Sequence, residues 1–191
     1  MYAQHKKLFI MMNKALFLDR DGVINKDLNY VYKLEDLHFV PGIKQLIKRA
    51  YHSKYKIICI SNQSGVGRNY FSLQDMNKFN QTINIYLENN NCPKIEAFYC
   101  AIGSPEDAKN NFREIGFFRK PFPGNFLIAK SDFNINLEKS IMVGDSWSDV
   151  VAANAAGVRN VYLYSKTSTI RQCNSCCIKI NHLNQVKIGE Q

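Results

Sequence analysis

Two aspartates, Asp19 and Asp21, stand one residue apart directly after the apolar run at residues 15–18, and Gly22 follows them. Acidic residues and glycine are common in turns. Two neighbouring carboxylates, however, repel each other unless a cation offsets their charge. The pattern therefore favours a site for a metal ion or a phosphoryl group over an ordinary turn.

Other polar segments supply the remaining groups that phosphoryl transfer requires. They contribute a hydroxyl, an amide, a third carboxylate and two cations, from Ser61, Asn62, Asp145, Arg119 and Lys120. Carboxylate oxygens suit Mg²⁺, and a lysine and a hydroxyl can bind phosphoryl oxygens. No histidine lies in these segments, and no Gly-rich loop ends in Gly-Lys-Ser or Gly-Lys-Thr. Histidine-based and P-loop chemistry are therefore disfavoured, which leaves phosphoryl transfer to a carboxylate assisted by a metal and a lysine.

The elements that must position these groups alternate between strands and helices. Short apolar runs predict strands at residues 14–18, 56–60, 95–100, 140–143 and 159–164. Apolar spacing and capping signals predict helices at residues 43–52, from residue 72 to about 88, from 124 to about 132, and up to 156. This order predicts a Rossmann-like three-layer α/β/α sandwich with a mainly parallel sheet and no large cap domain. Right-handed crossovers would bring the polar segments to one edge of that sheet.

Length and composition set the wider frame. We predict a single domain over the 191 residues, with a core at about 14–164, an extension at 1–12 and a tail at 166–191 that adds an edge strand and a short helix. Residues 101–118 form a long connection typical of an insertion or lid. The chain has no membrane-span signal and no signal peptide, so we expect a cytoplasmic protein without a membrane partner.

Charge and cysteines point to no further partner. The net charge of +9 comes from basic residues that stand singly or in pairs, without a nucleic-acid-binding signature. We therefore expect no nucleic-acid partner. We also expect the protein to be a monomer. The six cysteines form no regular framework, which predicts reduced thiols, and a zinc site at Cys173, Cys176, Cys177 and His182 is disfavoured.

Over roughly residues 14–164 the chain resembles the phosphatases of the haloacid dehalogenase superfamily. The motifs that carry the resemblance are Asp19-Arg20-Asp21-Gly22, Ser61-Asn62, Lys120, and Gly144-Asp145 with Asp149. More narrowly, residues 19–25, 39–42, 61–65 and 119–121 resemble the group that contains D-glycero-D-manno-heptose 1,7-bisphosphate phosphatase and histidinol-phosphate phosphatase.

The resemblance implies roles for these positions. Asp19 would be the nucleophile that forms an aspartyl-phosphate, Asp21 the general acid and base, and Ser61 and Lys120 the groups that bind the phosphoryl oxygens. Mg²⁺ would be held by Asp19, the backbone carbonyl of Asp21, and Asp145. The implied substrate-binding residues are Asp27, Leu28, Asn29, Tyr30, Asn62, Gln63, Ser64, Arg119 and Ser146. Asp149 remains open between such a role and a charge in the first turn of a helix.

One departure from the resembled group concerns zinc. That group supplies a Cys-x-His pair and a Cys-x-Cys pair, where this chain has Cys100-x-Ile102 and Gly116-x-Phe118. Only one ligand of the set is kept, so we expect no structural Zn²⁺.

The function expected from these observations is Mg²⁺-dependent hydrolysis of a sugar phosphate. The resemblance favours D-glycero-D-manno-heptose 1,7-bisphosphate, converted to the 1-phosphate in surface lipopolysaccharide synthesis. Histidinol-phosphate phosphatase and polynucleotide 3′-phosphatase are the alternative enzymes. A non-catalytic binding protein on the same scaffold is the alternative from another class.

Overall fold

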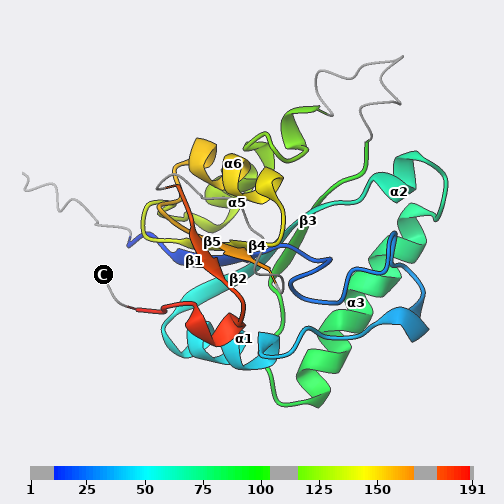
Figure 1. The fold of residues 1–191 in the computed structure, drawn as a ribbon, viewed down its shortest axis with the longest axis horizontal. Coiled ribbons are helices and arrows are strands. Elements are labelled where there is room, and N and C mark those ends of the chain that lie inside the picture. The colour runs from blue at the N-terminus through cyan, green and yellow to red at the C-terminus, as the bar shows by residue number, and fades with distance from the viewer. Residues whose placement is uncertain (1–10, 104–115, 166–175, 190–191) are drawn as a thin grey trace, which may run out of the picture.

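A six-stranded parallel sheet forms the centre of the molecule in the computed structural model, which describes residues 11–103, 116–165 and 176–189 (Figure 1). Its strands are β1 (Lys14–Leu18), β2 (Tyr55–Asn62), β3 (Ala97–Ala101), β4 (Ile141–Gly144), β5 (Asn160–Tyr164) and β6 (Ile178–Ile180). Their spatial order is β3-β2-β1-β4-β5-β6, and each neighbouring pair runs parallel. The predicted α/β/α sandwich is confirmed.

Helices cover both faces of this sheet (Figure 1). One face packs against α1 (Ile43–His52) and α3 (Leu73–Asn89), and the other packs against α5 (Gly124–Phe133) and α6 (Trp147–Ala156). Successive residues of β1 alternate between the two cores: Leu16 and Leu18 face the first, while Ala15 and Phe17 face the second. Because β1 is buried on both faces, the residue that follows it is held in a fixed position.

The helix signals of the sequence are confirmed at α3 and α6. Ser72 and Asp75 form a capping box at the start of α3, and Ser146 and Asp149 form another at α6. Helix α6 ends at Ala156 and is capped by Gly157, whose φ of 95° is left-handed and therefore favours glycine.

Element boundaries differ from the prediction around β2 and β3. Strand β2 extends through Asn62, because Ser61 and Asn62 pair with Cys100 and Ala101 of β3. Strand β3 starts only at Ala97, since the N–H of Ile95 donates to the Asn84 side chain instead of a strand. A short helix, α2 (Ser64–Gly67), stands where a plain polar loop was expected.

The C-terminal residues 176–189 add the predicted edge strand to the sheet and contribute side chains to the core. Strand β6 pairs with β5, and the short helix is a 3₁₀ turn, η3 (Leu183–Gln185). The guanidinium of Arg49 fastens this segment to α1 by donating to the carbonyls of Leu183 and Val186. Residues 1–10 of the predicted extension, most of the predicted lid and Cys173 lie outside the described residues. The single-domain assignment stays a prediction.

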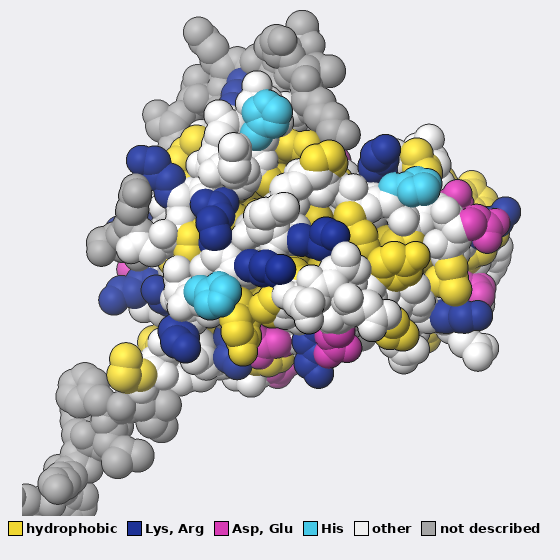
Figure 2. Space-filling model, turned by 90° about the horizontal axis from the view of Figure 1, so that it is seen from below, with side chains coloured by type: hydrophobic (Ala, Val, Ile, Leu, Met, Phe, Trp, Pro, Cys, Tyr) yellow, Lys and Arg dark blue, Asp and Glu magenta, His cyan; other side chains and the backbone are white. Residues whose placement is uncertain are grey.

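The basic character of the chain is visible on the face seen from below in Figure 1. Lys and Arg side chains gather near the centre of this face, whereas Asp and Glu lie toward its rim (Figure 2). Another turn, η1 (Leu34–Asp36), precedes α1. Within the described ranges no helix combines the length and apolar character that crossing a membrane requires.

Candidate active site

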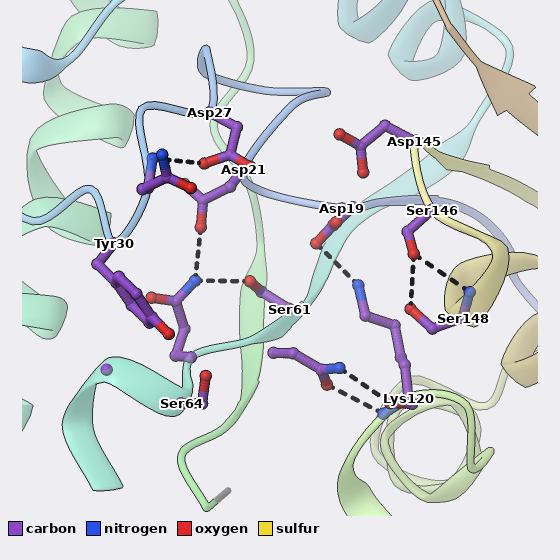
Figure 3. A pocket seen from close by; sticks show the side chains of 14 residues that line it. Asp19, Asp21, Asp27, Tyr30, Ser61, Ser64, Lys120, Asp145, Ser146 and Ser148 are labelled. Atoms are coloured by element: carbon purple, nitrogen blue, oxygen red, sulfur yellow. Dashed lines mark hydrogen bonds and ion pairs between the residues drawn. The ribbon is translucent and has the colours of Figure 1, made fainter. Parts of the chain in front are cut away.

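The polar segments predicted to converge do meet, at one hollow of about 300 Å³ (Figure 3). Strand β1 lies between β2 and β4, so Asp19, Ser61 and Asp145 come from three adjacent strand ends. Most of the predicted site residues line this hollow: Asp19, Asp21, Asp27, Asn29, Tyr30, Ser61, Asn62, Gln63, Ser64, Lys120, Asp145 and Ser146.

Lys120 is the buried cation of the site, with 4% of its surface exposed. Its Nζ lies 2.8 Å from Asp19 Oδ1 and 2.5 Å from Asp149 Oδ1, and it donates to the carbonyl of Ile60. Burial lowers the pKa of Lys120, but the carboxylates of Asp149 and Asp19 outweigh this and hold the pKa above its ordinary value. The side chain is therefore a fixed positive charge beside Asp19.

Asn62 fixes the backbone of Lys120. The Asn62 amide group donates to the Lys120 carbonyl over 2.9 Å, and its oxygen accepts from the Lys120 N–H over 3.0 Å. Both ends of the Asn62 side chain are thus engaged with the protein. Asn62 also lines the hollow, so its predicted contact with substrate stays a prediction beside this structural role.

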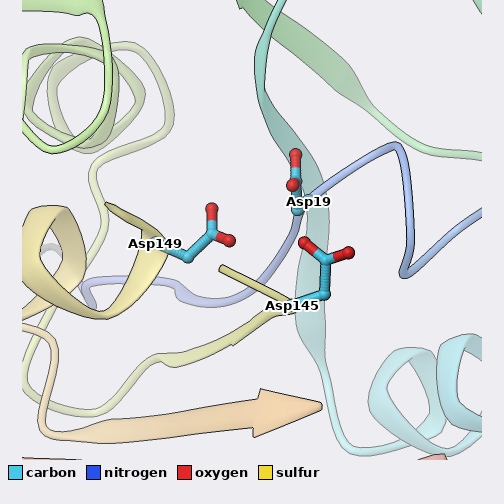
Figure 4. A group of neighbouring side chains, drawn as sticks. All are labelled: Asp19, Asp145 and Asp149. Atoms are coloured by element: carbon cyan, nitrogen blue, oxygen red, sulfur yellow. The ribbon is translucent and has the colours of Figure 1, made fainter. Parts of the chain in front are cut away.

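Three carboxylates, those of Asp19, Asp145 and Asp149, offer oxygen atoms within 4.8 Å of one another (Figure 4). Burial raises the pKa of Asp19 well above its ordinary value; Lys120 opposes the shift, and Asp149 and Asp145 add to it. Asp145 is exposed as a residue, yet loss of water around its carboxylate, with repulsion from Asp149, raises its pKa to about 7. Such a cluster of hard oxygen atoms fits a divalent cation such as Mg²⁺.

Gly22 permits the close approach of Asp145 to the first loop. Its φ is 88°, and a Cβ atom built there would collide with the Asp145 carboxylate. The glycine of the D-x-D-G pattern is therefore required both for the turn and for the space that Asp145 fills.

Asp149 contacts both the start of α6 and the buried lysine. Its Oδ2 accepts from the N–H of Ser146 at the start of α6, and its Oδ1 contacts Lys120. It is fully buried. The interpretation as a charge in the first turn of a helix is confirmed, and a role in the reaction stays a prediction.

Two predicted substrate residues do not line this hollow. Leu28 is 48% exposed and lines a neighbouring hollow beside Lys26 and Val40. The backbone turns sharply just after it, where Asn29 and Tyr30 have positive φ, so adjacent side chains leave in different directions. Arg119 directs its Nη1 to the carbonyl of Gly103, 3.3 Å away, while the next residue is turned inward.

Sequence reasoning assigned no role to Arg20, Asn25 or Ser148. Ser148 lines the hollow, whereas Arg20 and Asn25 are fully buried and contact Asp21 from behind. Arginine is seldom buried, and nothing in its spacing distinguishes it from a surface residue. Only its place between two site aspartates could have drawn attention to it.

A strand-end carboxylate beside a buried lysine and a second strand-end carboxylate defines an α/β enzyme suited to phosphoryl transfer. Comparison with known proteins agrees with this class. Residues 117–174 match the family model described as HAD-hydrolase-like. Known heptose-1,7-bisphosphate 7-phosphatases align with most of the chain.

Two relatives differ in the anomer that their names carry. The D-glycero-alpha-D-manno-heptose-1,7-bisphosphate 7-phosphatase of Burkholderia mallei is 38% identical over 80% of this chain and 80% of its own length. The D-glycero-beta-D-manno-heptose-1,7-bisphosphate 7-phosphatase of Helicobacter pylori (strain ATCC 700392 / 26695) is 40% identical over 78% of this chain and 82% of its own length.

A solved structure extends the similarity to the fold. The D,D-heptose 1,7-bisphosphate phosphatase of B. bronchiseptica, complexed with magnesium and phosphate, superposes with a TM-score of 0.78. It is 26% identical, and the match covers 91% of this chain and 95% of that one. This chain belongs to the haloacid dehalogenase-like hydrolases, in the family of the heptose-1,7-bisphosphate 7-phosphatases, which are phosphoric monoester hydrolases.

Proposed function

We propose that this chain removes the phosphate at C7 of a D-glycero-D-manno-heptose 1,7-bisphosphate, leaving the 1-phosphate, in a Mg²⁺-dependent reaction. The observation that carries the proposal is the pairing of the strand-end carboxylate Asp19 with buried Lys120, 2.8 Å apart. Relatives that share 38% and 40% of their aligned residues with this chain supply the substrate class.

In the proposed reaction Asp19 attacks phosphorus. A bond forms between its carboxylate oxygen and phosphorus while the bond from phosphorus to the C7 oxygen breaks. Asp21 gives its proton to that departing oxygen, which leaves as an alcohol. Water then attacks the phosphorus of the aspartyl-phosphate and gives a proton to Asp21. This step releases inorganic phosphate and restores Asp19. Ser61 and Lys120 bind the phosphoryl oxygens during both steps.

Asp19, Asp145 and the backbone carbonyl of Asp21 are the proposed Mg²⁺ ligands. The donor set fits, because Asp19 and Asp145 are oxygen ligands from the same cluster. When bound, Mg²⁺ supplies positive charge against the oxygens of the transferring phosphoryl group. Asp149 is already engaged by Lys120 and the Ser146 N–H, so we assign it to holding Lys120. We also expect no structural Zn²⁺, since Cys100 is the sole survivor of the expected ligand set.

The rest of the hollow suits a polyol. Asp27, Asn29, Ser64 and Ser146 present carboxylate, amide and hydroxyl groups to it. The Arg68 guanidinium donates to the Tyr30 hydroxyl over 2.9 Å, and the Tyr30 ring contacts Tyr70 edge-on. Such groups can exchange hydrogen bonds with sugar hydroxyls. We retain the expectations of a cytoplasmic monomer that does not act on nucleic acid.

The Asp19→Asn variant tests the chemistry. We expect its Mg²⁺-dependent phosphate release from the heptose bisphosphate to fall by at least about a thousandfold, because an amide cannot form the aspartyl-phosphate. EDTA should abolish wild-type release, and added Mg²⁺ should restore it. The control Asp36→Asn, in η1 and outside the hollow, should keep wild-type release. Near-wild-type release by Asp19→Asn would show that another group is the nucleophile.

A further inference from the structure

Among the residues that the structure describes, Arg20 is the largest side chain that is completely buried, with none of its surface exposed. Removing a guanidinium from water carries a large free-energy cost unless several hydrogen bonds and an opposite charge offset it. The proposed reaction gives this residue no task. Its surroundings show where the compensation lies.

The guanidinium of Arg20 forms an ion pair with the carboxylate of Asp21. Arg20 Nε lies 3.2 Å from both carboxylate oxygens of Asp21, and Nη2 lies 3.0 Å from Oδ2. A planar guanidinium that contacts a carboxylate through two nitrogens fixes its direction as well as its distance.

Arg20 is itself anchored to elements away from the hollow. Its Nη2 donates to the carbonyl of Val31 over 2.7 Å, and its Nη1 donates to Asn80 Oδ1 on α3 over 3.3 Å. The guanidinium also lies 4.9 Å from the ring centroid of Phe79, the neighbouring residue of that helix. Asp21 is therefore connected through Arg20 to the covering helix α3.

The carboxylate that Arg20 holds is turned toward the phosphoryl-binding side. On its other side Asp21 accepts from Gln63 Nε2 over 2.8 Å, and the same nitrogen donates to Ser61 Oγ over 2.8 Å (Figure 3). Gln63 lines the hollow, whereas Arg20 lies behind Asp21. The carboxylate thus faces the region where Ser61 is proposed to bind phosphoryl oxygens.

We infer that Arg20 is a positioning residue for Asp21, which aims the carboxyl group at the departing oxygen. The inference rests on the proposed function, in which Asp21 is the general acid. General-acid catalysis contributes about a hundredfold to ten-thousandfold and requires the acid within hydrogen-bonding reach of the leaving atom. A loosely held carboxyl group would lose much of that factor.

The test compares two leaving groups. The two esters are heptose 1,7-bisphosphate and p-nitrophenyl phosphate. A sugar alkoxide needs a proton to leave, whereas p-nitrophenolate leaves readily without one. For Arg20→Lys we expect kcat on heptose 1,7-bisphosphate to fall about thirtyfold or more with KM changed less than about threefold. The single-turnover rate of p-nitrophenol release should change less than about threefold. The matched control Arg49→Lys removes a guanidinium that binds the carbonyls of Leu183 and Val186, which do not line the hollow, and should change neither rate.

Asp21→Asn separates this inference from the proposed function. If Asp21→Asn fails to show a selective loss on the sugar ester, the general-acid assignment is wrong. If Asp21→Asn shows that loss while Arg20→Lys slows both esters alike, or neither, the role of Arg20 is overturned. If Arg20→Lys does not fold, Asn80→Ala offers a second test, because it removes one hydrogen-bond partner of the guanidinium. It should also lower kcat selectively on the sugar ester, by a smaller factor. Equal effects of Asn80→Ala on both esters would contradict the inference.

Discussion

Lys120 is fixed at the scale of single residues by two independent sets of contacts. Its ammonium group is held by Asp19, Asp149 and the carbonyl of Ile60, and its backbone is held by Asn62. A lysine side chain is flexible, so a defined ammonium position requires that the backbone be fixed as well. We therefore expect Asn62 to affect catalysis through its hold on Lys120.

Replacement of Asn62 tests this assignment. We expect Asn62→Ala to lower the free energy of unfolding by about 2 kcal/mol, because two hydrogen bonds of about 1 kcal/mol each are lost. Phosphate release should fall at least about tenfold. Urea denaturation and steady-state assays measure the two effects. Exposed Asn77→Ala on α3 is the control, expected within about 0.5 kcal/mol of wild type. Unchanged activity in stable Asn62→Ala protein would refute the positioning role.

Individual side chains differ in how far the sequence predicts them. Asp19, Asp145 and Lys120 could be assigned because their types and their places beside predicted elements carry chemical meaning. The role of Arg20 could not, since its burial depends on Phe79 and Asn80, which reach it from a helix distant in sequence. The pairing of Asn62 with the Lys120 backbone could not be predicted either, because it is a contact between residues distant in sequence.

At the scale of elements, the start of α3 carries a pH-dependent contribution to stability. Hydrogen bonds from the Ser72 hydroxyl and N–H hold the pKa of Asp75 below its ordinary value of 3.8. A lowered folded-state pKa stabilises the folded protein above the unfolded pKa, and that stabilisation is lost as pH falls through the folded pKa.

Asp75→Asn should therefore lower the free energy of unfolding at pH 7. The difference from wild type should begin to shrink as the pH falls below about 3.9 and should be lost as the pH falls through the lower folded-state pKa. Denaturation at a series of pH values measures this. In a Ser72→Ala background the pH-dependent part should shrink, because the Ser72 hydroxyl is the largest cause of the shift. A difference that stays constant down to acid pH would contradict the capping assignment.

Elements were predictable where local signals suffice. The apolar run of β1, the one-sided apolar spacing of α1 and the Ser72 capping box of α3 each depend on residues close in sequence. The ends of β2 and β3 were missed because they are set by pairing between Ser61 and Cys100 and between Asn62 and Ala101. Such pairing is a contact between strands and leaves no trace in either strand alone.

At the scale of the whole molecule, parallel topology creates the site. Three adjacent strands end at the same edge, so residues distant in the sequence reach one hollow. This convergence follows from the order of elements and was predictable. The substrate side was less predictable, because loop side chains such as Leu28 and Arg119 depend on local backbone turns and carbonyl contacts.

The central claim is hydrolysis of a heptose 1,7-bisphosphate, and a comparison of kcat/KM across substrates tests it most directly. The panel holds both anomers of the heptose bisphosphate, histidinol phosphate and a 3′-phosphorylated oligonucleotide, assayed for Mg²⁺-dependent phosphate release. Asp19→Asn serves as the blank for contaminating phosphatases.

We predict that one heptose anomer exceeds histidinol phosphate and the oligonucleotide by at least about a hundredfold, a difference of about 2.7 kcal/mol in transition-state binding. Mass spectrometry of that product should show the heptose 1-phosphate. A kcat/KM highest for histidinol phosphate or for the oligonucleotide, and abolished in Asp19→Asn, would keep the carboxylate chemistry and contradict the proposed substrate.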